Sequence, residues 1–244
     1  MKVSTYIIPM TDSFPQLDYL IIACHPDDAE IGCGGAILAL KAQGAKVGVL
    51  DLTDGEPTPH GSPEIRQLEC AAATALLGLD WRGNLGLPNR SLIADLAARK
   101  LLAGMIRQLR PSALITHYWE DAHPDHVAAS ALVKAARFWA KLSKTDMPGS
   151  PHYPAKVLYF PSMHLRQHLK PSFVLDVTPY HERKLQALAC YHSQFIAGRP
   201  ATSPTVFDDV TARARYFGWL IGALYGEPFL SREEVGVRDL RQLS

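Results

Sequence analysis

Residues 17–35 read LDYLIIACHPDDAEIGCGG, and this stretch decides the fold class. Its first part, Leu17–Cys24, is a continuous apolar run of strand length, which is typical of a strand buried on both faces of a parallel sheet. A polar turn follows at His25–Glu30. Apolar residues then recur through Ile31–Gln43, and Gly44 is a typical helix stop. The stretch therefore predicts a strand, a polar turn and a helix.

The same alternation continues along the chain. Further strands are expected over Lys46–Leu52, Trp81–Leu85, Ala113–His117, Val157–Phe160 and Phe173–Val177. Further helices are expected over Pro63–Leu77, Leu92–Leu109, His126–Leu142, Thr178–Tyr191 and Val210–Tyr225. Strands alternating with helices predict an α/β fold with a mostly parallel sheet and helices on both faces. A Pro- and Gly-rich break at Thr145–Pro154 could divide two domains, but the part beyond it has too few elements to build its own core. We therefore expect an N-terminal arm, residues 1–16, and one domain over residues 17–244.

Composition excludes several classes of protein. The 244 residues are 47% hydrophobic and 20% charged, which is a globular balance. Lys and Arg number 25 against 24 Asp and Glu, a formal charge of +1, so we expect no nucleic-acid partner. Nowhere do 18 apolar residues run together, so we expect no membrane-spanning helix. The cysteines form no CxxC motif, and no export signal is recognisable, which predicts reduced thiols in a cytoplasmic protein: Cys24, Cys33, Cys70 and Cys190.

Two clusters of histidine and aspartate follow predicted buried strands. His25–Asp28 reads HPDD directly after the first strand, and His123–His126 reads HPDH shortly after the strand Ala113–His117. In an open parallel sheet, ligands bind beyond the carboxyl ends of the strands, where the chain order reverses. We therefore expect the two turns to converge at that edge of the sheet.

The spacing inside the clusters has a physical meaning. His25 and Asp28 are three residues apart, as are His123 and His126, and this spacing shares a face in a helical first turn. Three protein ligands with an open fourth position form a catalytic zinc site. We predict His25, Asp28 and His126 as the ligands. Asp27 is then free to act as a general base, and His123 to stabilise a developing oxyanion.

Simpler interpretations exist for each cluster alone. HPDD could be a helix N-cap, and HPDH a surface turn. Both clusters together favour a cation site, because buried carboxylates are costly without one. A non-haem iron oxygenase also uses two histidines and one carboxylate, but a spare base and an oxyanion donor favour hydrolysis.

A second alternative is a dinucleotide site. Gly32–Gly35 opens the first helix and Asp51 ends the second strand, as in a nucleotide-binding fingerprint. Three acidic residues between the strand and the glycines, Asp27, Asp28 and Glu30, would repel a pyrophosphate. We expect the glycines to allow close helix packing instead.

Other polar residues give weaker signals. Arg66 lies in the first turn of a helix near the expected sheet edge, where its fork could hold substrate oxygens. Tyr191–Phe195 ends a helix, and helix capping is its simpler interpretation. The remaining histidines have no distinctive spacing and are expected at the surface or in the core: His60, His117, His152, His164, His168 and His181.

Three motifs in this order, HPDDAEIGCGG, GSPEIRQLE and EDAHPDH, resemble the PIG-L/LmbE-like N-acetylglucosaminyl deacetylases. LGLPNR, YHSQF and the tail ARARYFGWLIGALYGEPF resemble the branch that deacetylates N-acetylglucosaminyl-malate in bacillithiol synthesis. The resemblance implies a Rossmann-like α/β fold and a divalent metal, usually Zn2+, with Fe2+ or another divalent ion as the alternative. It also implies an amino-sugar substrate and a homo-oligomer, commonly a hexamer.

The resemblance also assigns roles to single residues. It implies the same ligands, His25, Asp28 and His126. Asp27 corresponds to the base and His123 to the group that steadies the tetrahedral intermediate. Among substrate-binding residues it implies Arg66, with Tyr191 of YHSQF as a second candidate. One departure bears on the substrate: the branch usually carries Arg just before HPDH, where this chain has Ala122.

Overall fold

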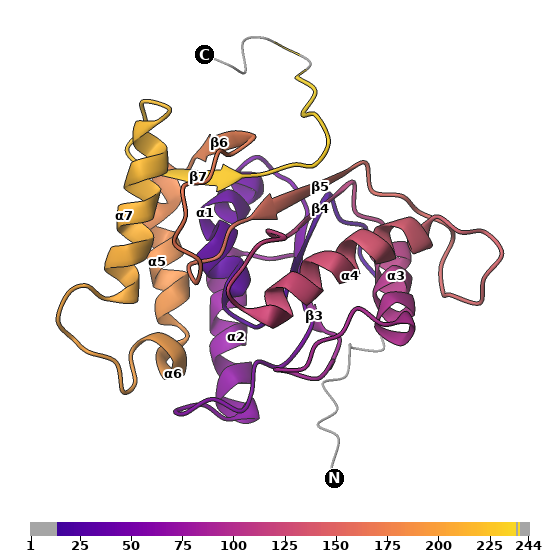
Figure 1. Cartoon of the computed structure of the whole chain (residues 1–244), viewed down its shortest axis with the longest axis horizontal. Coiled ribbons are helices and arrows are strands. Elements are labelled where there is room, and N and C mark those ends of the chain that lie inside the picture. Colours follow the sequence, from indigo (N-terminus) through magenta and orange to yellow (C-terminus); the bar gives the residue numbers. More distant parts are fainter. Residues whose placement is uncertain (1–13, 238, 240–244) are drawn as a thin grey trace.

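The computed structural model describes residues 14–237 and 239, so most of the predicted N-terminal arm lies outside the described residues. Its centre is a sheet that lies between helices (Figure 1). The strands of this sheet are parallel and run in the order β3-β2-β1-β4-β5. The strands are β1 (Tyr19–Ala23), β2 (Val47–Asp51), β3 (Trp81–Asn84), β4 (Ala113–His117) and β5 (Lys156–Phe160). Ile21 of β1 pairs with Val49 of β2 on one side and with Ile115 of β4 on the other. The chain order thus reverses between β1 and β4, and the predicted parallel sheet is confirmed.

Helices cover both faces of this sheet, as predicted. Successive side chains of a strand point to opposite faces, so β1 contributes Leu20 and Ile22 to one apolar cluster and Ile21 and Ala23 to the other. The first cluster is completed by α3 (Leu96–Leu109) and α4 (Pro124–Ala140). The second is completed by α1 (Asp28–Ala42) and α2 (Pro63–Leu77), across which α5 (His181–Ala189) packs.

The C-terminal part adds a small antiparallel sheet of β6 (Phe173–Asp176) and β7 (Gly226–Phe229). The strand β7 was not predicted, because a four-residue segment containing Pro228 gives almost no strand signal. The last helix, α7 (Val206–Trp219), begins and ends earlier than expected. Thr205 starts it with a capping box, in which its side chain and that of Asp208 bond each other's backbone N–H groups.

Helix boundaries decide where the polar turns lie. The expected helix Pro63–Leu77 is confirmed, with Ser62 as N-cap and Gly78 in the left-handed conformation after it. The helix expected from Leu92 begins at Leu96, because the side chain of Asp95 caps it. The expected helix Thr178–Tyr191 is divided into a 3-10 turn, η1 (Thr178–Tyr180), and α5, and the short α6 (His192–Phe195) follows it.

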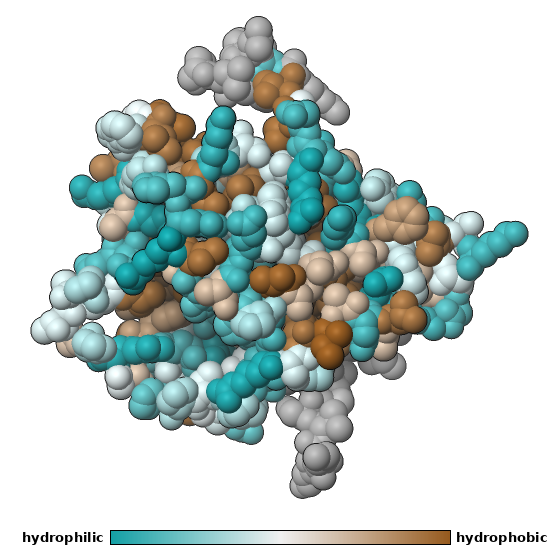
Figure 2. All heavy atoms as spheres, in the orientation of Figure 1, coloured by the Kyte–Doolittle hydropathy of each residue, from teal (hydrophilic) through white to brown (hydrophobic). Residues whose placement is uncertain are grey.

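The face shown in Figure 2 is mostly polar, with apolar side chains in several separate places. Exposed apolar side chains also lie where α7 ends. Trp219 is 74% exposed and Leu224 52% exposed, and Leu220 and Ile221 lie between them. Among the described residues, no helix is long and apolar enough to cross a membrane.

Candidate active site

The turns after β1 and β4 meet at the carboxyl edge of the sheet and bring three ligand atoms together. His25 Nδ1 lies 3.1 Å from Asp28 Oδ2, and His126 Nε2 lies 3.3 Å from the same oxygen. The two histidine nitrogens are 3.4 Å apart. Ligands at the 2.0–2.1 Å distance of a tetrahedral zinc site are separated by about 3.3 Å. Two imidazole nitrogens and one carboxylate oxygen at this spacing therefore fit a divalent cation.

Local backbone conformation holds these side chains in place. α1 begins at Asp28, whose carboxylate accepts from the backbone N–H of His25 at 2.8 Å. Asp27 just before it has a φ of 124°, which is rare for a residue with a side chain and is typical of strained functional turns. His123 is the N-cap of α4, so His126 stands in the first turn of that helix. The helix begins two residues earlier than predicted because Pro124 suits a first helical position.

A second carboxylate orients His126. Its Nδ1 lies 2.8 Å from Asp121 Oδ2, so in the neutral ring Nδ1 carries the hydrogen and Nε2 has the lone pair that a cation requires. Burial disfavours a charged imidazole here, but the carboxylates of Asp28 and Asp121 raise the pKa of His126 to about 10. The site is thus a negative centre that stabilises a positive charge.

Asp27 directly precedes the proposed ligand Asp28, and its side chain is bonded to Arg66. Arg66 Nη1 donates to Asp27 Oδ2 at 2.9 Å and to the Pro26 carbonyl at 2.7 Å, and its Nε donates to Glu56 at 3.2 Å. Burial, together with the charge of Asp28, raises the pKa of Asp27 to about 7, and Arg66 opposes this rise. A carboxylate with a pKa near neutrality is suited to accept and return a proton. Arg66 itself is only 2% exposed, so the structure places it as the residue that holds Asp27.

His123 is close to the ligands and presents a hydrogen-bond donor. Its ring lies 4.5 Å from that of His126 and 4.9 Å from that of His25, centroid to centroid. Its Nδ1 accepts the backbone N–H of Asp125 at 3.2 Å, so its Nε2 carries the hydrogen. Burial lowers the pKa of His123, which keeps the ring neutral and able to donate from Nε2.

Two histidines that the sequence did not single out also lie here. His117, the last residue of β4, stacks on His126 at 4.1 Å, and its Nε2 is 3.4 Å from Asp28 Oδ2. Its position at the end of a predicted strand could have identified it as a residue of this site. The ring of His164 lies 5.4 Å from that of His126, although it comes from the loop after β5 and shares no spacing with either cluster.

The structure does not bring Tyr191 to the site, and the prediction that it binds substrate is corrected. Its side chain is fully buried, and its hydroxyl donates to Glu30 at 3.1 Å. The other residues of its motif connect distant segments: Ser193 bonds Glu69 of α2, and the side-chain amide of Gln194 donates to Thr58. The motif therefore anchors α6 to the N-terminal part of the chain.

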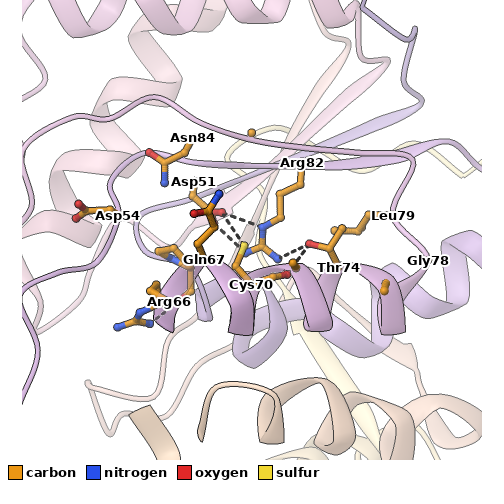
Figure 3. A pocket seen from close by; sticks show the side chains of 14 residues that line it. Asp51, Asp54, Arg66, Gln67, Cys70, Thr74, Gly78, Leu79, Arg82 and Asn84 are labelled. Atoms are coloured by element: carbon orange, nitrogen blue, oxygen red, sulfur yellow. Dashed lines mark hydrogen bonds and ion pairs between the residues drawn. The ribbon is translucent and has the colours of Figure 1, made fainter. Parts of the chain in front are cut away.

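The residues of the dinucleotide alternative are used elsewhere. Both carboxylate oxygens of Asp51 accept from Arg82, at 2.9 and 3.1 Å, beside a groove of about 590 Å³ between α2 and β3 (Figure 3). A Cβ on Gly35 would lie 2.8 Å from the Val177 side chain, and the Gly35 N–H donates to Glu227. The glycines allow close packing, as expected.

Comparison with known proteins identifies the family. The model of the PIG-L family, GlcNAc-PI de-N-acetylase, matches residues 20–137. A diacetylchitobiose deacetylase of Thermococcus kodakarensis is 30% identical over 72% of this chain and 69% of its own. A 1D-myo-inositol 2-acetamido-2-deoxy-alpha-D-glucopyranoside deacetylase of Thermobifida fusca is 29% identical, with the match spanning 57% of this chain and 60% of that protein. The crystal structure of a conserved protein from Thermus thermophilus superposes with a TM-score of 0.84, at 39% identity over 91% of this chain and 97% of that one.

Proposed function

Because this chain belongs to the PIG-L family of metal-dependent N-acetylglucosaminyl-type deacetylases, we propose that it hydrolyses the 2-acetamido group of an N-acetylglucosaminide with Zn2+ at the site described above. One observation carries the proposal. His25 Nδ1, Asp28 Oδ2 and His126 Nε2 lie 3.1–3.4 Å apart, with a carboxylate and an imidazole donor beside them. These three atoms would hold the cation.

The surrounding residues supply the proton transfers of an amide hydrolysis. The bound cation provides Lewis acidity, which polarises the acetamide carbonyl and lowers the pKa of water. Asp27, held by Arg66, takes the proton from the attacking water and then delivers it to the leaving amine nitrogen. The Nε2–H of His123 donates to the oxygen of the tetrahedral intermediate. Asp27 thus transfers the proton, and His123 stabilises the negative charge on oxygen.

For the aglycone, we propose malate. The motifs LGLPNR and YHSQF and the C-terminal tail support this proposal, since they resemble the bacillithiol branch. The relatives described above are named for other aglycones, diacetylchitobiose and an inositol glycoside. This chain has Ala122 where that branch usually carries Arg. A cationic side chain that binds the malate carboxylates must therefore come from another position.

We further propose a cytoplasmic homo-oligomer. The four cysteines form no disulfide, which supports a reducing compartment. The apolar residues Trp219–Leu224 at the end of α7 support an interface between copies, because exposed apolar patches mark interaction sites.

The test is acetate release from a matched set of N-acetylglucosaminides. The protein loaded with Zn2+ or with Fe2+ is incubated with the malate, inositol, N-acetylglucosaminyl and methyl glycosides. Acetate release from at least one, without oxygen consumption, is expected. Metal-loaded protein that releases no acetate from any glycoside, or that consumes oxygen with Fe2+, contradicts the proposal.

A further inference from the structure

A cavity of about 350 Å³ adjoins the proposed metal ligands at Asp28. Apart from Asp28 and Ile31, every residue that lines it lies between Ser162 and Asp209. This segment is outside the part of the chain that the family model matches, residues 20–137. The chemistry and the cavity wall therefore come from different parts of the chain. Asp28 belongs to both parts, so this cavity is a candidate site for the aglycone of a sugar bound at the ligands.

Positively charged side chains line this cavity and the one next to it. Arg199 lines it directly, and Arg166 and Arg213 line a second cavity of about 310 Å³ that shares Met163 and Asp209 with it. Within residues 14–237, none of the three arginines forms an ion pair with a carboxylate. Burial lowers the pKa of Arg213 to about 10, which still leaves it charged at neutral pH. Across the two cavities, these three arginines stand against two lining carboxylates, Asp209 and the proposed ligand Asp28.

Arg199 is held so that its terminal amino groups are available. Its Nε donates to the Gln194 carbonyl at 3.0 Å, which orients the guanidinium. Gln194 is in turn fixed by Thr58, and the neighbouring Ser193 by Glu69 of α2. Residues 20–137 carry the proposed ligands and form the metal-binding half of the molecule. The YHSQF motif therefore positions Arg199 relative to the metal-binding half.

We propose that Arg199 is a specificity-determining residue that binds a carboxylate of the aglycone in the cavity beside Asp28. The inference rests on the proposed deacetylation of an N-acetylglucosaminide. A guanidinium grips a carboxylate through two parallel hydrogen bonds, whereas the methyl group of Ala122 offers none. The guanidinium that binds the aglycone thus comes from the segment after α6 and not from the turn before HPDH.

The test compares two glycosides, N-acetylglucosaminyl-malate and methyl N-acetylglucosaminide. Arg199→Met should lower the ratio of kcat/KM, malate over methyl, by about 10- to 150-fold, the range expected for a hydrogen bond to a charged group. The loss should fall mainly on KM for the malate glycoside. Calorimetry with the deacetylated product, glucosaminyl-malate, should show a Kd raised by a similar factor. Arg199→Lys should recover part of both.

Matched variants separate this effect from a general change of charge. Arg110→Met removes an equal charge from an exposed position after α3 and should leave the ratio unchanged. Asp209→Asn should raise the preference for malate, because it removes the opposing carboxylate. Loss of both substrates in proportion, or an unchanged ratio in Arg199→Met, overturns the inference while leaving the deacetylase in place. Wild-type protein that releases acetate from the inositol or N-acetylglucosaminyl glycoside but from neither of these two also overturns the inference, whereas protein that releases acetate from none of the four glycosides refutes the proposed function as well.

Discussion

The metal-binding half and the cavity wall of this protein are built in different ways. The proposed ligands His25, Asp28 and His126 stand at the ends of two adjacent parallel strands or in the first turns of the helices after them. The wall comes from loops and the ends of α6 and α7, and Arg199 and Asp209 in it are exposed. Reaction chemistry needs positions held to fractions of an ångström, which packed elements provide. Residues that select the substrate can differ on connecting segments without disturbing the geometry of the ligands.

The largest effect is expected from Asp28→Ala. Its Oδ2 is the atom that both proposed histidine ligands approach, so its loss should abolish stoichiometric metal binding, measured by elemental analysis. Asp209→Ala removes the other carboxylate that lines the same cavity and should keep one ion per chain. Full metal content in the Asp28 variant would show that the ligands are wrongly assigned.

Asp27→Asn should keep the metal and lose turnover. The amide oxygen still accepts the hydrogen bond of Arg66, but it cannot take a proton from water. A loss in kcat of about 10²–10⁴-fold is expected for removal of a general base. Near-normal kcat with metal retained would exclude Asp27 from this role.

His123→Ala should also keep the metal, with a smaller loss in rate. Removing one donor to an oxyanion costs about 10²–10³-fold in kcat. The measurements are steady-state kinetics and elemental analysis on the same preparation. If the variant loses its ion, His123 is a ligand, which its position within 4.8 Å of the His25 and His126 nitrogens would permit.

Asp121→Asn tests whether Asp121 orients the ring of the proposed ligand His126. The carboxylate fixes Nδ1–H of His126, and loss of such a partner weakens metal binding by about 10- to 100-fold. Competition with a chelator measures the change, and Asp95→Asn, at the cap of α3, is the control. Equal metal affinity in the two variants would remove Asp121 from the support of the site.

The smallest effect is expected where Ser193 of α6 bonds Glu69 of α2 and so fixes the cavity wall. Ser193→Ala leaves the buried carboxylate of Glu69 with one hydrogen bond fewer, and the free energy of unfolding should fall by about 1–3 kcal/mol. Thermal unfolding should show a Tm lower by about 2–4 °C per kcal/mol, with metal content unchanged. Ser91→Ala, at an exposed serine, should be neutral. Loss of metal in the Ser193 variant would show that the two regions are not separable.

Much of the metal-binding half could be read from the sequence because its signals are local. Leu17–Cys24 and Ala113–His117 are apolar runs that form parallel strands, and parallel strands end at a common edge. The HPDD and HPDH turns that follow them must therefore approach each other. The wall could not be read in this way, since Arg199 and His164 carry no periodic signal and reach the cavity only through the packing of α6 and the loop after β5.

The sequence by itself determined the α/β alternation, the ends of α2 and the pairing of two polar turns, because each depends on residues within one or two turns of each other. Only the tertiary structure decided that β7 pairs with β6, that the ring of Tyr191 is buried against Glu30, and that His117 stacks on His126. Each of these contacts depends on the space that distant elements leave when they pack. The hydrophobic pattern selects which face of an element is buried, but the shape of the partner face decides which side chains meet.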